Sequence, residues 1–181
     1  IENIDVGGPT MVRAAAKNYN DVTVITSVDH YSELINELKK NKGCTSLKFR
    51  EKMSRLAFGE TAYYDAVISN YFNKFDNINF PKRKILYTNL IENLRYGENP
   101  HQMSAFYSQD IKNKLEQIHG KTLSYNNYSD IFAALTISKS LPKNAGTVIV
   151  KHGNPCGVSI LKDNLYSYKS ALKSDPISAF G

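Results

Sequence analysis

The sequence predicts an α/β fold. Short runs of β-branched and apolar residues alternate along the chain with longer segments whose apolar residues recur every three or four positions. The clearest strand is 147–150, which is followed at once by Lys151, His152 and a turn rich in Gly and Pro. With 181 residues, 41% of them hydrophobic, the chain can form one or two domains with cores of their own.

The first helix is predicted to open at Gly-Gly-Pro-Thr, residues 7–10, because proline is favoured in a first turn. Arg13 and Lys17 lie one helical turn apart, so an anion between them would offset their repulsion. A helix N-terminus also favours anions, although two cations on a surface helix are usually just solvated. The opposite, apolar side carries Met11, Val12, Ala15 and Tyr19.

A strand at 22–27, an amphipathic helix at 32–42 and a pair of helices at 46–58 and 61–75 are expected next. We interpret Asp29-His30 as turn chemistry before the amphipathic helix. The helix at 61–75 carries an aromatic stripe, which is far more often core or interface than a cofactor site. We expect it to be buried, within the chain or against a second copy. The stripe consists of Tyr64, Ile68, Tyr71 and Phe75.

The polar segment 76–84 is the best linker candidate, because it combines a proline with three clustered basic residues. The sequence therefore predicts two domains, 1–84 and 85–181. In the second domain we expect an extended segment at 85–91, a strand start at 105–107, a helix from Ser129 or Asp130 to Leu141, and a helix at 164–173.

Several classes of function are disfavoured by composition. No apolar run approaches the ~20 residues of a membrane span, and no signal peptide is visible. Two cysteines make no disulfide framework, so we expect a reducing compartment, the cytoplasm. His152 and Cys156 lack further zinc ligands, so no metal is expected. The net charge of +6 comes mostly from scattered lysines, so we expect no nucleic-acid partner.

Lys151 and His152 bring a cation and an imidazole together where a strand ends. Histidine exchanges protons near neutral pH, and a neighbouring ammonium can stabilise negative charge as it develops. For a lone Lys-His pair, two solvated polar residues would be the better interpretation. The Asn-Pro-Cys-Gly sequence that follows favours a site, because crevices at strand ends bind ligands in open α/β sheets.

Five segments in this order resemble the family of AICAR transformylase/IMP cyclohydrolase, the bifunctional enzyme of purine biosynthesis. Residues 20–84 resemble it only loosely. The family's protein is much longer, so we expect this chain to be an internal piece with little or no activity alone. The segments are IENIDVGGPTMVRAAAKN, LRYGENPHQ, GKTLSYNN, VIVKHGNPCGV and SDPISAFG.

The resemblance implies the end of a doubly wound, methylglyoxal-synthase-like cyclohydrolase domain joined to the start of a cytidine-deaminase-like α/β transformylase domain. The transformylase passes a formyl group from formyl-tetrahydrofolate, its co-substrate, to the amine of aminoimidazole carboxamide ribonucleotide (AICAR). The cyclohydrolase then closes formylated AICAR to inosine monophosphate (IMP). Members of the family form homodimers, so we expect a homodimer here.

The resemblance also assigns roles in the transformylase half. His152 matches the proton acceptor of formyl transfer, and Lys151 matches the lysine that stabilises the transition state. Arg95 and Tyr96 match the pair that binds the aminoimidazole nucleotide, and Asn127 falls at a further substrate contact. We expect Lys151 and His152 to end a buried strand and to face a cleft together with Arg95 and Asn127.

In the cyclohydrolase half, Lys17 matches the catalytic lysine. Asp5, which we also count as catalytic, and Val6 match a pair that contacts the nucleotide product. One alternative remains open, a nucleotide-binding or oligomerisation module without chemistry. Such a module would bind phosphates through Arg13, Lys17 and Arg95 and associate through the aromatic helix.

Overall fold

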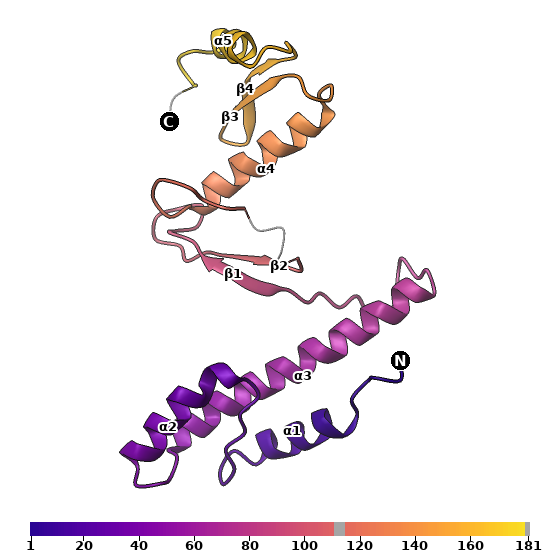
Figure 1. Cartoon of the computed structure of the whole chain (residues 1–181), viewed down its shortest axis with the longest axis vertical. Coiled ribbons are helices and arrows are strands. Elements are labelled where there is room, and N and C mark those ends of the chain that lie inside the picture. Colours follow the sequence, from indigo (N-terminus) through magenta and orange to yellow (C-terminus); the bar gives the residue numbers. More distant parts are fainter. Residues whose placement is uncertain (111–114, 180–181) are drawn as a thin grey trace. The chain divides into compact units, whose positions relative to one another are not determined.

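The computed structural model describes residues 1–110 and 115–179 and divides into two compact units, Ile1–Tyr87 and Thr88–Gly181 (Figure 1). The predicted mixed α/β class is confirmed. The strands of the described residues pair as two antiparallel, two-stranded sheets, both within the second unit. Of the helices in these residues, none combines the length and apolar character needed to cross a membrane. The last two residues of the SDPISAFG segment lie outside the described residues.

The first unit is built from helices, and its elements are α1 (Gly7–Lys17), the short 3₁₀ helix η1 (Val28–His30), α2 (Tyr31–Lys40) and α3 (Leu47–Phe75). The strand predicted at 22–27 is wrong, since no strand is assigned there. A strand needs a neighbour for its backbone groups, and this half-buried segment has no strand partner among the described residues.

The two helices expected at 46–58 and 61–75 are one continuous helix, α3. Gly59 lies between the two expected ranges, but a single glycine inside a helix costs only about 1 kcal/mol and does not end it. The Ser46 side chain caps the helix by accepting a hydrogen bond from the Phe49 amide at 3.3 Å.

Helix α1 packs against α3 (Figure 1). The Ser54 hydroxyl donates to the Ala16 carbonyl at 2.7 Å, and Ala16 is buried. Of the residues expected on the apolar side, Met11 is 71% exposed, whereas Val12, Ala15 and Tyr19 are half-buried beside the buried Ala16. The buried apolar residues of this unit are Ala16, Phe49, Met53, Ala57 and Ala66.

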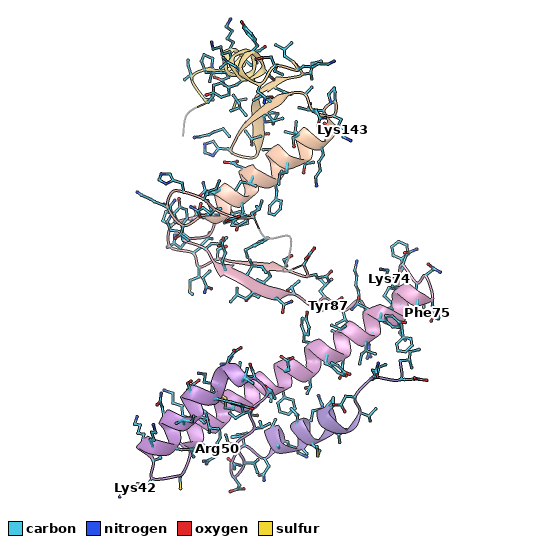
Figure 2. All side chains as sticks on the ribbon, viewed as in Figure 1. Lys42, Arg50, Lys74, Phe75, Tyr87 and Lys143 are labelled. Atoms are coloured by element: carbon cyan, nitrogen blue, oxygen red, sulfur yellow. The ribbon has the colours of Figure 1, made fainter. Side chains whose placement is uncertain are left out.

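Arg50 fastens the loop after α1 to the start of α3 (Figure 2). Its guanidinium donates to the carbonyls of Tyr19, at 2.8 Å, and Asn20, at 2.7 Å, and also to that of Thr45. One planar side chain thus accepts no bond but donates to carbonyls of two loops, the loop after α1 and the loop between α2 and α3.

The aromatic stripe on α3 is only partly covered within the chain. Tyr64 and Ile68 are half-buried, but Tyr71 and Phe75 are 51% and 67% exposed. Burial within the chain is therefore wrong for the last turns of α3, where Phe75 lies (Figure 2). The N-terminal segment contacts α3 at Tyr64, whose hydroxyl accepts a hydrogen bond from the Asp5 amide at 2.8 Å.

The second unit begins with the antiparallel pair β1 (Asn89–Asn93) and β2 (Ala105–Ser108), followed by α4 (Tyr125–Ser140). Helix α4 starts four or five residues before the predicted cap at Ser129 or Asp130. Ser124 and Asn127 form a reciprocal capping box, in which each side chain binds the other's backbone amide.

A hairpin of β3 (Thr147–Lys151) and β4 (Asn154–Ser159) comes next, and α5 (Asn164–Ser174) packs on it (Figure 1). Residues 154–157, predicted as a turn, belong to β4, where Pro155 sits at a register shift in the pairing. Strand β3 is half-buried rather than buried. A Cβ at Gly157 would lie only 2.0 Å from the Ala171 carbonyl oxygen, so glycine lets α5 lie directly on the strand.

Candidate functional site

Three segments far apart in the sequence line one polar hollow of about 460 Å³ in the second unit. They are the loop after β1, the first turns of α4 and the turn between β3 and β4. Six of the eight lining residues come from three of the segments that carry the family resemblance. The lining residues are Glu98, Asn99, Tyr125, Asn126, Ser129, Asp130, His152 and Gly153.

The β3–β4 turn places His152 at this hollow. Lys151 and Asn154 pair across the hairpin, which leaves His152 and Gly153 as a two-residue loop. Both have positive φ, 53° and 72°, as in the type I′ turns that suit the twist of a hairpin. The His152 side chain is exposed, so it is accessible for proton exchange with a ligand. The Asn154 side chain donates to the His152 carbonyl at 3.0 Å.

The loop before the hollow holds Arg95 and Tyr96 side by side. The guanidinium carbon lies 4.8 Å from the Tyr96 ring centroid, and Nη2 donates to the phenol oxygen at 3.2 Å. A hydrogen bond with Ser124, followed by the adjacent Arg95 guanidinium, lowers the pKa of the Tyr96 hydroxyl. Backbone bonds Arg95 N–Leu123 O, at 2.9 Å, and Tyr125 N–Tyr96 O, at 3.1 Å, join this loop to the start of α4.

We expected Lys151, His152, Arg95 and Asn127 to face one cleft, but the structure does not place all four at one hollow. Of the four, only His152 lines the hollow. Glu98, three residues after Arg95, and Asn126, next to Asn127, line it instead. The side-chain oxygen Oδ1 of Asn127 is engaged at the helix start, where it accepts hydrogen bonds from the Ser124 amide and hydroxyl, each at 2.9 Å. The structure thus places His152 beside the segments that carry these residues rather than beside their side chains.

In the first unit, Asp5 lies just before α1 and lines a separate hollow of about 260 Å³. Its Oδ1 accepts from the Gly8 amide at 2.8 Å, which holds the carboxylate at the helix N-terminus. The lining residues of this hollow are Asp5, Gly8, Pro9, Val12, Thr26, Glu60, Thr61 and Tyr64.

The structure does not bring Lys17 and Val6 into that hollow. Lys17 is exposed in the last turn of α1, and a rise of about 1.5 Å per residue puts it roughly 15 Å along the helix from Gly7. Val6 is 73% exposed. Arg13 does not form a cation pair with Lys17; its guanidinium carbon lies 5.5 Å from the centre of the Phe58 ring.

Sequence reasoning missed most of the polar residues around His152. Asp130 was interpreted as a helix cap, yet its Oδ1 accepts from the Gly153 amide at 2.6 Å. Glu98 and Asn126 were not singled out, although the Asn126 side chain donates to the Glu98 carbonyl at 3.1 Å. The Ser-x-x-Asn pattern of the capping box was the available signal, since it sets which residues of α4 share a face. Within the described ranges, no cluster of three or more His, Cys, Asp or Glu could hold a metal ion.

Comparison with known proteins gives one consistent answer. The family model described as "AICARFT/IMPCHase bienzyme" matches residues 15–181. The chain is 46% identical over 187 residues to the bifunctional purine biosynthesis protein PurH of Bradyrhizobium diazoefficiens, and 47% over 182 residues to that of Leptospira biflexa. In both cases all of this chain is covered but only 35% of the relative, so the chain spans about a third of their length.

Proposed function

Because the chain belongs to the AICARFT/IMPCHase bienzyme family, we propose that it is an internal segment of an enzyme that completes the synthesis of IMP. The transformylase half transfers a formyl group from formyl-tetrahydrofolate to the amine of AICAR. The cyclohydrolase half closes formylated AICAR to IMP with loss of water. The observation that carries the proposal is the polar hollow where His152 meets two other family-like segments.

In formyl transfer, His152 serves as the general base. The amine of AICAR is a poor nucleophile, because it is conjugated with the carboxamide through the ring, so a base must take its proton as it attacks the formyl carbon. The tetrahedral intermediate carries an oxyanion, which the ammonium of Lys151 stabilises. In other acyl transfers the loss of one such donor costs about 3–4 kcal/mol.

The loop after β1, which carries Arg95 and Tyr96, binds the nucleotide. The forked donors of the Arg95 guanidinium suit a phosphate, and the Tyr96 ring holds that guanidinium in a defined plane. Asn127 serves as a further substrate contact, with its amide nitrogen as the available group, because its oxygen belongs to the capping box.

For ring closure we assign Lys17 as the catalytic lysine, Asp5 as a second catalytic group and Val6 as a contact of the product. Asp5 is supported by its place in the lining of a hollow, where its carboxylate can accept hydrogen bonds from donor groups of a nucleotide. Lys17 lies at the other end of α1, so its part in ring closure requires groups from the rest of the longer protein.

We assign residues 1–84 to the cyclohydrolase domain and residues 85–181 to the transformylase domain. The division of the structure after Tyr87 is compatible with this boundary. The finer fold assignment is the end of a methylglyoxal-synthase-like domain followed by the start of a cytidine-deaminase-like domain. Both would be completed by the remainder of the longer protein, which we place in the cytoplasm.

A second candidate function is a nucleotide-binding or oligomerisation module without chemistry of its own. The exposed aromatic residues at the end of α3 favour this candidate, because they offer a surface for a second copy. The two candidates are compatible in the longer protein, where a homodimer would carry the two activities. Alone, this chain would have little catalysis.

Two assays on single variants of the full-length protein test the proposal. His152→Ala should lower formyl transfer to AICAR by ~100-fold or more, as loss of a general base does, and leave the cyclisation of supplied formyl-AICAR near wild type. Lys17→Ala should do the reverse. One variant that stays folded and abolishes both activities would contradict the assignment of two sites.

A further inference from the structure

We propose that Asp130 is a positioning residue for His152, acting through the Gly153 backbone amide. The inference rests on the formyl-transfer function proposed above. The Gly153 amide donates to Asp130 Oδ1 at 2.6 Å, a charge-assisted hydrogen bond between the hairpin turn and α4. Asp130 and His152 line the same hollow, so the residue that holds the turn borders the space where substrate would react.

The turn needs an external support because its conformation is costly for histidine. His152 has a φ of 53°, in the left-handed region, which is sterically unfavourable for residues other than glycine. Asn or Asp would suit this position of a type I′ turn better. A side chain retained in an unfavourable backbone conformation points to a functional demand on that side chain, and its surroundings must hold it there.

Helix α4 supplies a rigid base for this support. Asp130 is the sixth residue of α4, which begins at a capping box and packs against β3. Its side chain is half-buried, so its carboxylate has less freedom than one on an open surface. The chain of contacts therefore runs from the helix to the carboxylate, from the carboxylate to the Gly153 amide, and from there to His152.

Loss of this contact should affect the rate more than binding. Without the Asp130 carboxylate, the two-residue turn can leave the left-handed conformation and carry the imidazole away from the reacting amine. A misplacement of about 1 Å can cost ~100-fold in rate. Asparagine keeps an acceptor oxygen at the same position, so it should restore most of the positioning without the negative charge.

The test compares Asp130→Ala, Asp130→Asn and a matched control in the full-length protein. The control is Asp163→Ala, which removes another carboxylate that accepts one backbone bond, from the Tyr166 amide at 2.9 Å. We expect Asp130→Ala to lower kcat for formyl transfer by about 100-fold with a smaller change in KM. Asp130→Asn should recover most of kcat. Asp163→Ala should weaken the cap of α5 but keep kcat.

A second readout is independent of activity. In protein labelled with ¹⁵N-glycine, the Gly153 amide of the wild type should exchange slowly with solvent, and Asp130→Ala should accelerate that exchange. Asp130→Asn should remain protected. If Asp130→Ala folds too poorly for kinetics, the exchange rates of the Gly153 amide in the wild type and in Asp130→Asn still test the inference.

Three results would overturn the inference. Asp130→Ala could keep kcat within about threefold of wild type, or Asp130→Asn could be as impaired as Asp130→Ala, which would assign the effect to charge. The Gly153 amide could also exchange freely in the wild type. The proposed function fails in a different way, through a wild-type enzyme without formyl transfer, and that result would remove the basis of the inference as well.

Discussion

The Tyr128 hydroxyl on α4 donates a hydrogen bond to Glu92 Oε1 on β1 at 2.5 Å. This contact joins two elements that lie 36 positions apart in the chain. The Tyr128 ring is buried and stacks on Phe106 of β2, with 4.7 Å between ring centroids. The first sheet and α4 are therefore held by one aromatic stack with a charged acceptor at its edge.

Tyr128→Phe should destabilise the second unit while keeping the stack. It removes a hydrogen bond to a charged group, which contributes about 1.5–3 kcal/mol, and leaves a half-buried carboxylate without this donor. Urea unfolding of the chain measures the change. The Tyr128→Phe, Glu92→Gln double variant should lose less than the sum of the single losses. Additive losses would mean that the two groups do not interact.

The same pair makes stability depend on alkaline pH. Burial, reinforced by the hydrogen bond and negative charge of Glu92, raises the pKa of Tyr128 to about 12, from 10.0. The folded state keeps the proton that the unfolded state loses between these values. The contribution of Tyr128 to the free energy of unfolding is therefore complete below pH 10. It falls by about 1.4 kcal/mol per pH unit between pH 10 and pH 12. Wild type should lose stability faster than Tyr128→Phe across that range; parallel curves would refute the assignment.

His152→Asn should raise stability while it removes formyl transfer. Asparagine tolerates the left-handed region better than histidine, so we expect a gain of about 0.5–1 kcal/mol in the free energy of unfolding. His152→Ala, which lacks that tolerance, serves as the comparison and should be less stable than His152→Asn. Thermal unfolding of wild type and both variants measures these differences in stability. A His152→Asn variant less stable than wild type would show that the turn is not strained.

Gly157→Ala should destabilise the hairpin, because its Cβ would overlap the Ala171 carbonyl at 2.0 Å and force α5 away from β4. Overpacking of this kind typically costs about 1–3 kcal/mol. Gly59→Ala is the matched control, since nothing lies within 4 Å of a Cβ there. In the middle of α3 it should stabilise by about 0.5–1 kcal/mol. Chemical denaturation of the two variants should shift in opposite directions.

The exposed end of α3 should act in self-association. In sedimentation equilibrium, Phe75→Glu should weaken any dimer of this chain, because it places a charge in a face that also includes Tyr71. Met103→Glu is the control, at a fully exposed apolar residue of the other unit. Equal effects of the two substitutions would contradict a specific interface on α3.

Local sequence signals predicted the elements that depend on few partners. The β-branched run 147–150 became β3, and α5 begins at Asn164 as expected. The strand predicted at 22–27 failed because a strand also requires a neighbour to accept its hydrogen bonds, and a local pattern carries no information about that neighbour.

The candidate site was predictable at His152 but not around it. The Lys-His-Gly sequence carried its own chemical signal, whereas Asp130 looked like any helix cap. Its bond to Gly153 depends on how α4 packs against β3, a relation between segments 23 positions apart. Asn127 has a structural part that the sequence comparison did not reveal, because its side-chain oxygen also belongs to the capping box at the start of α4.

Because His152 is held in the left-handed region, substitutions at this position should differ from most others in how the cell degrades the variant protein. Most damaging substitutions lower abundance, because unfolded protein is degraded. At position 152 an asparagine would leave a chain that is inactive yet more durable than the original, so proteolysis would spare it. Selection for expression alone would accordingly drive this position away from histidine.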